Sequence, residues 1–407
     1  MLRCPLLEGT LGSAIKEPPT MTALLRNGGL KEAKMTNASG PARIIAGAAS
    51  ASRRGVLVAG AGGVFSLTLG LGRSVPAQQV QGPLNMLGWA EYVSPANIEA
   101  WEEMTGTRLI YDAYSSNDEM LSKLQLAGGA SGYDIGMNTD FMIPLLINRE
   151  LIHELDKSRL RSLANIDPDF LGRDFDPENN YTVPKSWGSQ GYIYDREVIQ
   201  REMRSWSDFV DAVKNEASGM VSLLDDPLAI APLMWKDGES WNSTDEAVLD
   251  RVEKEVEELA PHIRTFNTYP MQDVANGTVK LAQNWNGYCR LIMQSANNPN
   301  LVFDYGAPKT ELWLDSYHMP AGGEHADAAY SWLNFILEPE RAAEEISYTG
   351  YASPVPGARE FLPEDVANDP LIFPAREVIL RGERTQRNES YDRRIAIFTK
   401  FKAASAL

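Results

Sequence analysis

The chain has 407 residues, of which 43% are hydrophobic and 9% aromatic, and its formal net charge is −17 at pH 7. This length and hydrophobic content predict two compact lobes and exclude a chain that is disordered throughout. The acidic balance excludes nucleic acid as a partner, because a phosphate backbone would be repelled. It suits a cationic partner, although a solvated acidic surface is the simpler explanation.

Cysteine and histidine are both scarce. The two cysteines, Cys4 and Cys289, form no CxxC pair, and the four histidines never recur at the i, i+4 spacing of a zinc-binding helix. If Cys4 is removed with a leader, Cys289 has no internal disulfide partner and is expected to be a small buried apolar residue. The sequence therefore predicts no metal site and no cofactor.

The N-terminal segment has the pattern of an export signal. Arg53 and Arg54 precede a Gly- and Ala-rich apolar run, Gly55–Leu71, and Val75-Pro76-Ala77 supplies the small residues of a cleavage site. This order predicts a secretory leader over 1–77, and the paired arginines resemble a twin-arginine signal. A membrane anchor is the alternative interpretation of the apolar run.

The same run imitates a dinucleotide-binding loop at Gly60–Gly63. Phe65 stands where the third glycine of GxGxxG is needed, and no helical pattern follows, so we reject that interpretation. Beyond the leader no further long apolar run occurs, and the remaining chain is predicted to be soluble and even more acidic.

The first part of the exported chain alternates between strand and helix patterns. Ile98, Trp101 and Met104 are spaced three residues apart, which predicts one apolar face of a helix, and Gly106 marks the end of this helix. The predicted elements are a strand over Leu84–Trp89, a helix over Pro95–Met104, a strand over Arg108–Tyr111, and a helix through Leu126 that opens on a capping box, Ser116 to Glu119. This alternation predicts an α/β sheet with helices on its faces.

The middle and the end of the chain continue this alternation. The predicted elements are a strand at Tyr192–Tyr194, a helix over Trp206–Val213 with Ser205 or Ser207 at its cap, a strand over Met220–Leu224 that ends at Asp225-Asp226-Pro227, a helix opened by a capping box at Ser243–Glu246 and stopped before Pro261, and a helix over Ala328–Leu337. Two extended, aromatic-rich stretches, Tyr181–Trp187 and Leu312–Met319, are the segments where we expect the chain to cross between lobes.

Nine short motifs occur in one order over roughly residues 84 to 380. They are GWAEYV (Gly88–Val93), YSSNDEM (Tyr114–Met120), GYDIGM (Gly132–Met137), ANIDPDFL (Ala164–Leu171), FDPENNYTVPKSWG (Phe175–Gly188), NWNG (Asn284–Gly287), LWLDSYHMP (Leu312–Pro320), TGYASPVPGAR (Thr349–Arg359) and PEDVANDPLIFP (Pro363–Pro374). In this order they resemble the periplasmic spermidine/putrescine-binding proteins, and the resemblance spans nearly the whole exported chain.

The resemblance implies a two-lobed α/β periplasmic-binding-protein fold of type II, with the ligand in the cleft between the lobes. It implies a first lobe from 78–187 plus 315–350, a second lobe from 188–314, and C-terminal helices over 351–407 that pack across both. It also implies a monomer that is exported to the periplasm and delivers a polyamine to an ABC transporter permease in the inner membrane, rather than an enzyme.

Polyamine recognition needs carboxylates around each ammonium, because an unpaired buried ammonium is very unfavourable, and aromatic walls beside the methylenes. Cation–π contacts contribute about 0.5–2 kcal/mol each, and charge-assisted hydrogen bonds about 1.5–3 kcal/mol. The period-2 spacing of Trp313 and Asp315 places both on one face of an extended segment. Carried over motif by motif, the resemblance implies these ligand-binding residues: Trp89, Glu91, Tyr92, Thr139, Phe141, Asp226, Trp285, Trp313, Asp315 and Tyr351.

Several positions depart from the family pattern. A glutamate of spermidine-binding members is Ala229 here, a serine and a tyrosine are replaced by Thr139 and Phe141, and a late glutamine aligns with either Thr385 or Gln386. The loss of one carboxylate predicts a ligand with fewer charges than spermidine, or a different charge spacing. Putrescine or a related amine fits, and so does an opine or an amino-acid derivative.

Two other classes of function compete with that of a binding protein. A hydrolase would use paired acids such as Asp226 and Asp315, but no GxSxG elbow, P-loop or Cys–His pair occurs. A metal carrier would use Asp225-Asp226, but the chain has no adjacent tyrosines of the kind that ferric-ion binders use. Without the resemblance, tryptophans are mostly packing residues, and we expect five of them in the cores: Trp101, Trp206, Trp235, Trp241 and Trp332.

Overall fold

The computed structural model describes residues 80–126 and 131–406, so the leader predicted over 1–77 lies outside the described residues. The strands are β1 (Leu84–Trp89), β2 (Leu109–Tyr114), β3 (Ile135–Thr139), β4 (Val183–Asp195), β5 (Val221–Leu223), β6 (Ile263–Phe266), β7 (Leu281–Trp285), β8 (Leu301–Asp304), β9 (Thr310–His318) and β10 (Gly382–Glu383).

The α-helices follow the alternation that the sequence predicts. They are α1 (Pro95–Thr105), α2 (Asn117–Leu126), α3 (Ile143–Asn148), α4 (Trp206–Lys214), α5 (Pro232–Trp235), α6 (Glu246–Leu259), α7 (Met271–Ala275), α8 (Asn286–Ala296), α9 (Ala326–Ile336), α10 (Pro339–Thr349), α11 (Glu364–Ala367), α12 (Arg376–Leu380) and α13 (Tyr391–Ser405). Three short 3-10 turns matter below: η1 (Asp140–Met142), η5 (Pro227–Ile230) and η7 (Pro356–Phe361). None of the described helices is long and apolar enough to span a membrane.

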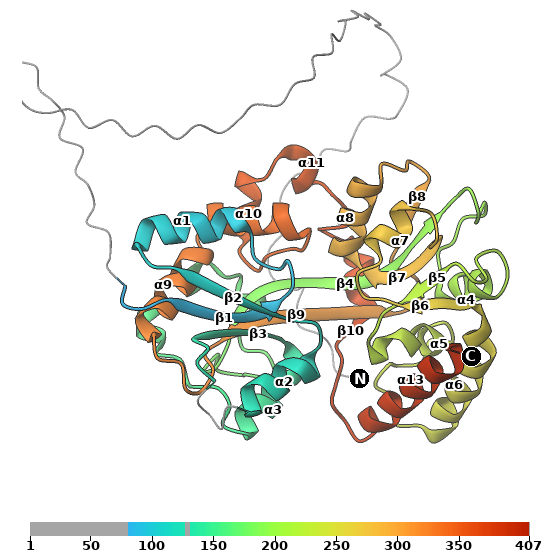
Figure 1. The fold of residues 1–407 in the computed structure, drawn as a ribbon, viewed down its shortest axis with the longest axis horizontal. Helices are drawn as coiled ribbons and strands as arrows, with labels where there is room; N and C mark the ends of the chain where they lie inside the picture. Colours follow the sequence, from blue (N-terminus) through green and yellow to red (C-terminus); the bar gives the residue numbers. More distant parts are fainter. Residues whose placement is uncertain (1–79, 127–130, 407) are drawn as a thin grey trace, which may run out of the picture. The chain divides into compact units, whose positions relative to one another are not determined.

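The strands pair in the order β2-β1-β3-β9-β4-β7-β5-β6, with β10 beside β9 and β8 beside β4. The pairs β1–β2, β1–β3, β5–β6 and β5–β7 are parallel, whereas β9 and β4 are antiparallel to their neighbours in this order. The first part of β4 pairs with β9 and its last part with β7 and β8. These two long strands therefore run from one group of helices to the other (Figure 1).

Two sets of buried side chains define two lobes. The first lobe packs β1, β2 and β3 against α1, α9 and α10, with α2 and α3 on a smaller adjoining core. The second lobe packs β4 and β5 against α4, α5, α6 and α13, with α7 and α8 on the other side. All five tryptophans predicted to be packing residues are at most 1% exposed, which confirms their core positions. Cys289 is likewise a free and buried thiol, as predicted.

The helix caps confirm one predicted boundary and correct another. α1 ends at Gly106, whose φ of 70° is in the left-handed region that glycine adopts easily. The capping box predicted at Ser243 is wrong: Asp245 caps α6 by accepting from the backbone N–H of Ala247 at 2.9 Å, while Ser243 accepts from the N–H of Asp245. An aspartate nearer the first turn competes successfully for the free N–H groups.

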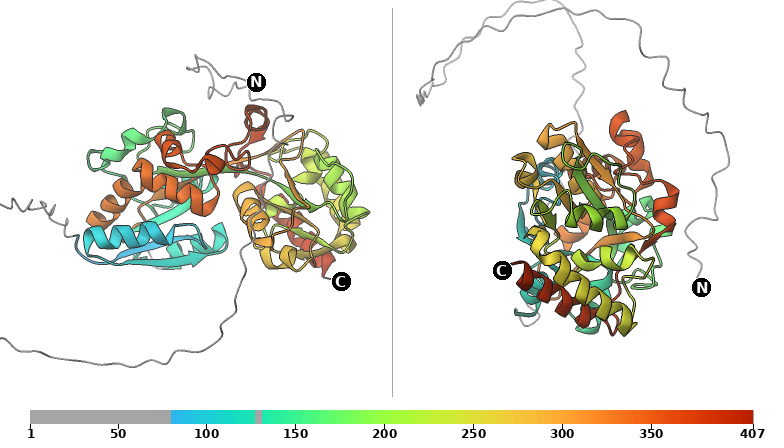
Figure 2. Two further views of the ribbon diagram at one scale, coloured as in Figure 1. Left: turned by 90° about the horizontal axis from the view of Figure 1, so that it is seen from above. Right: turned by 90° about the vertical axis from the view of Figure 1, so that its right-hand side faces the viewer.

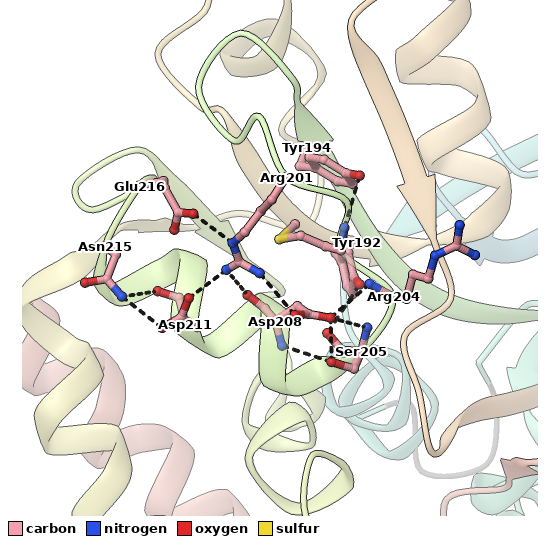
Figure 3. A network of polar contacts seen from close by, with 10 residues as sticks. Tyr192, Tyr194, Arg201, Arg204, Ser205, Asp208, Asp211, Asn215 and Glu216 are labelled. Atoms are coloured by element: carbon pink, nitrogen blue, oxygen red, sulfur yellow. Dashed lines mark hydrogen bonds and ion pairs between the residues drawn. The ribbon is translucent and has the colours of Figure 1, made fainter.

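The start of α4 shows a complete capping box (Figure 3). Of the two serines predicted for this cap, Ser205 is the one: its Oγ accepts from the N–H of Asp208 at 3.1 Å, and the Asp208 carboxylate accepts from the N–H of Ser205 at 3.0 Å. Arg201 then forms ion pairs with Asp208, Asp211 and Glu216 at 3.1, 2.8 and 2.8 Å. This network fixes the helix on the outer side of the second lobe.

The C-terminal segment contributes to both lobes in different places. η7 packs on α10, whereas α13 lies along α6 and adds Ile397, Phe398 and Phe401 to the core of the second lobe (Figure 2). Between them, β10 pairs with β9 at Thr310 and Glu311. The residue boundaries given for the lobes from the sequence stay a prediction.

Candidate functional site

One cavity brings the predicted residues together. Its volume is about 1090 Å³, including the part that is open to solvent. The lining includes every residue that the sequence pattern singled out for ligand contact: Trp89, Glu91, Tyr92, Thr139, Phe141, Asp226, Trp285, Trp313, Asp315 and Tyr351. Because these residues come from segments far apart in the chain, their convergence on one cavity is a property of the fold.

Strand β9 supplies the base of the cavity. Its side chains alternate, so Glu311, Trp313 and Asp315 all face the cavity from one side of the strand. Asp315 lies opposite Thr139 of β3, and Trp313 lies opposite Gly188 of β4. The register of the strands that join the two lobes thus positions the central indole and the carboxylate.

Asp315 forms one polar end of the cavity and is 5% exposed. Burial raises the pKa of this carboxyl, and this effect outweighs the lowering by four neighbours: Thr139, Tyr92, Lys185 and Trp89. Over residues 80–126 and 131–406, three polar atoms here have no well-formed hydrogen bond: Oδ1 of Asp315, the hydroxyl of Tyr92 and Nε1 of Trp89. A carboxylate oxygen and a phenol oxygen can therefore both accept from a donor that enters the cavity.

A buried ion pair supports this end from behind. Nζ of Lys185 lies 3.3 Å from Oε2 of Glu345 and 3.9 Å from the ring centroid of Tyr92. Burial lowers the pKa of Lys185, and Glu345 opposes that change. The Glu345 carboxylate also accepts from the backbone N–H of Ser94 and from Nδ2 of Asn97, which reduces the penalty of burying the charge. Lys185 is not part of the cavity lining, but its ammonium contacts the Tyr92 ring and lowers the pKa of Asp315.

Aromatic rings form the walls between the two ends. The Tyr351 ring lies edge-on to Trp313 at 4.9 Å and to Tyr92 at 5.9 Å between centroids. Gly287 allows this close packing, because a Cβ there would lie 2.5 Å from Cδ1 of Tyr351. Edge-to-face pairs of this kind stabilise the wall and keep the ring faces accessible to a ligand.

Gly188→Ala is expected to destabilise the protein by about 1–3 kcal/mol through overpacking. An added Cβ would lie 2.5 Å from Cζ2 of Trp313 and 2.7 Å from Oδ1 of Asn286. Urea unfolding measures the loss. If the indole is the main obstacle, adding Trp313→Leu to the alanine variant restores part of the stability; an equal loss in both backgrounds contradicts this explanation.

The second polar end contains Asp226 and a carboxylate that sequence analysis missed. Asp226 caps η5 by accepting from the N–H of Leu228 at 2.9 Å, and burial raises its pKa to about 6. Nε1 of Trp285 donates to Oε2 of Glu311 at 3.3 Å, and both side chains line the cavity. Glu311 could have been found by extending the alternation of Trp313 and Asp315 by two residues.

The positions that depart from the family pattern lie in different surroundings. Ala229 lies in the core of the second lobe, and Thr385, not Gln386, lines the cavity. The ring centroids of Phe141 and Tyr391 lie 6.0 Å apart. An aromatic pair therefore stands where Phe141 replaces the tyrosine of the family pattern. Besides Glu311, further lining residues missed by sequence reasoning include Trp241, Tyr269, Tyr288 and Tyr391. Trp241, predicted only as a core residue, therefore packs in the core and also lines the cavity.

The charge of the lining is of one sign. Its ionisable acids are Glu91, Asp225, Asp226, Glu311 and Asp315, and over the described ranges no lysine, arginine or histidine is among the lining residues. Within the same ranges, no group of histidine, cysteine and acidic side chains is arranged to hold a metal ion. The cavity is therefore suited to a cationic molecule with an apolar body.

Comparisons with known proteins agree with this chemistry. The model of a family described as "Bacterial extracellular solute-binding protein" matches residues 96–375. The chain is 31% identical over 320 residues to the spermidine/putrescine-binding periplasmic protein of Escherichia coli (strain K12), covering 77% of this chain and 90% of that protein. It is 24% identical over 329 residues to the putrescine/agmatine-binding protein of Pseudomonas aeruginosa, covering 77% and 89%.

A solved structure supports the same assignment of the fold. The spermidine/putrescine ABC transporter substrate-binding protein of Streptococcus pneumoniae superposes with a TM-score of 0.69 at 26% identity, over 80% of this chain and 100% of that one. The two lobes and the connecting strands β4 and β9 are thus those of the two-lobed α/β fold that the sequence predicts. The chain belongs to the family of bacterial extracellular solute-binding proteins.

Proposed function

We propose that this protein captures a short aliphatic polyamine in the cavity between its lobes and delivers it to an ABC importer, without catalysing a reaction. The observation that carries the proposal is the lining: acids at both ends, aromatic walls between them, and no basic side chain over the described ranges. The names of the relatives in Escherichia coli and Pseudomonas aeruginosa, which include putrescine in both cases, support it.

The proposed contacts follow from the geometry. Asp315 and Tyr92 accept hydrogen bonds from one ammonium group, with the Trp89 ring beside it. Trp313 and Tyr351 pack against the methylene chain. Asp226, next to Trp285, attracts the other end of the ligand. Glu91, Thr139 and Phe141 complete the lining, and these roles of the ten residues are part of the proposal.

The charge of the lining also separates the polyamine from the alternatives. An opine or an amino-acid derivative carries carboxylates, which would need arginine, lysine or other charge-assisted donors. A cavity with acids at both ends repels such groups. A diamine places one positive charge at each end, and we therefore favour putrescine or a molecule of similar length.

We propose further that the protein works as a monomer in the periplasm and meets a permease of the inner membrane. The relatives named periplasmic support this location. Export by the twin-arginine route is proposed from Arg53 and Arg54 alone, which lie outside the described residues.

A thermal-shift panel tests the proposal directly. Ligand at one hundred times its dissociation constant stabilises the folded state by about 2.7 kcal/mol, which corresponds to a rise of several degrees in Tm. We expect this rise with putrescine, and no rise with glutamate or an opine. A shift with the carboxylate-bearing molecules and none with putrescine, agmatine or spermidine contradicts the proposed function.

A further inference from the structure

Glu311 is a buried acid that has no charged partner among the residues that the structure describes. Its side chain is 3% exposed and lines the cavity. Oε2 accepts from Nε2 of Gln190 at 3.2 Å and from Nε1 of Trp285 at 3.3 Å, and Oε1 accepts from Oγ1 of Thr385 at 3.4 Å. All three donors are neutral and the distances are at or beyond the long end of the normal range. Over the described ranges, no ion pair reaches this carboxylate.

The charged groups around Glu311 are mostly of its own sign. Asp226 at the start of η5 and Asp140 in η1 both repel it. The guanidinium of Arg384 lies 3.4 Å from Asp140 and also pairs with Asp174, so it is already engaged by other acids. Burial, together with Asp226 and Asp140, raises the pKa of Glu311 to about 8.

Glu383, the β10 neighbour of Glu311 in the sheet, is the remaining acid close to it in register. Its carboxylate accepts from Nε1 of Trp235 and from the N–H of Trp241, both at 2.6 Å, and it does not line the cavity. Two hydrogen-bond donors at short distance therefore stabilise the Glu383 carboxylate, and its function is structural. The hydrogen bonds that Glu311 accepts are longer, and such an acid in a cavity indicates a function rather than a contribution to stability.

The position of Glu311 complements that of Asp315. Both lie on one face of β9 with Trp313 between them, and four residues of strand separate their Cα atoms by roughly 13 Å. A fully extended butane-1,4-diammonium spans about 6 Å between its nitrogens, as bonds of about 1.5 Å require. The remaining length is enough for a carboxylate and a hydrogen bond at each end.

We propose that Glu311 is a ligand-binding carboxylate that receives the second ammonium group of an α,ω-diamine, so that Glu311, Trp313 and Asp315 form an acid–indole–acid ladder for a dication. This inference rests on the proposed function and specifies its ligand class. It adds Glu311 to Asp226 at the second end of the cavity and makes that end selective for a charged terminus.

Binding at this end is coupled to a proton. Near pH 7 the Glu311 carboxyl is protonated before the diamine enters, because its pKa is about 8. The arriving ammonium keeps its own proton and favours the carboxylate, so the O–H proton of Glu311 leaves to solvent as the ion pair forms. Binding of the diamine thus releases one proton from Glu311 to solvent and forms one ion pair between Glu311 and an ammonium group.

Isothermal titration calorimetry with putrescine and 1-aminobutane tests this inference on the wild-type protein and on Glu311→Gln. The two probes share a four-carbon chain and differ in the second ammonium. We expect the variant to bind putrescine at least 10-fold more weakly and 1-aminobutane within about twofold of wild type, because only the diamine loses a charge-assisted contact. Glu377→Gln, which removes an exposed charge on α12, serves as the matched control with unchanged values for both.

A second readout is the number of protons released on binding. Titrations of wild type near pH 7 in two buffers with different ionisation enthalpies are expected to show proton release with putrescine, and Glu311→Gln is expected to release less. Equal putrescine affinity in wild type and Glu311→Gln, with equal proton release, overturns the inference while leaving the proposed function intact. If wild type binds no amine at all, the proposed function falls and the inference falls with it.

Discussion

Asp315→Asn is expected to weaken putrescine binding by about 100-fold. The carboxylate is buried and its Oδ1 has no well-formed hydrogen bond to any described residue, so it is available to an ammonium. A charge-assisted hydrogen bond contributes about 1.5–3 kcal/mol, and the asparagine leaves the buried ammonium without a counter-charge. Calorimetry with putrescine measures the change.

The control for Asp315→Asn is Glu99→Gln, which removes the same charge from the exposed face of α1. Its dissociation constant is expected to stay within about twofold of wild type, because exposed charges are screened by solvent. The folded state of Asp315→Asn should be at least as stable as wild type, since a buried carboxyl with a raised pKa is unfavourable. A putrescine affinity within threefold of wild type would show that Asp315 does not bind the ammonium.

The fold was predictable where local signals agree with tertiary structure. β1 and α1 begin at the residues that the sequence predicts, and Pro95 and Gly106 mark the two ends of α1. β4 was predicted only in two separate pieces, since its buried polar residues, such as Ser189 and Gln190, do not follow a strand pattern. Those residues are satisfied by partners distant in sequence, which no local pattern reveals.

The candidate site was predictable through motifs and less so through chemistry. The ten residues taken from the motifs all line one cavity. The core tryptophans were predicted from their residue type alone, because tryptophans are mostly packing residues. Glu311 was missed because the LWLDS motif begins one residue after it, although alternation along β9 places it beside Trp313. Tyr391 was missed, and Thr385 stayed one of two alternatives, for another reason: both reach the cavity from the C-terminal segment, and only the long-range packing of α13 and the pairing of β10 bring them there.

The protein without ligand is expected to lose a few kcal/mol of stability as the pH rises from about 5 to about 8. Burial raises the pKa of Asp226 to about 6, of Asp140 to about 7 and of Glu311 to about 8, whereas the unfolded chain has ordinary values near 4. In this window the folded state binds more protons than the unfolded state, so the free energy of unfolding falls as pH increases. A tenfold difference in proton affinity between the folded and unfolded states corresponds to about 1.4 kcal/mol of stability.

Urea unfolding at pH 5.5, 6.5 and 7.5 measures this slope, and variants of the acids show how much each carboxyl contributes to it. Glu311→Gln should flatten the curve over the whole window, and Asp226→Asn only near its lower end, because each group contributes to the slope between its unfolded and its folded pKa. Saturating putrescine should reduce the fall, since a dication between the acids stabilises their ionised forms and binds only the folded protein. A stability that stays constant or rises from pH 5.5 to 7.5 would mean that these carboxyls are ionised without a ligand, and that the cavity does not depend on an incoming cation to hold its charges.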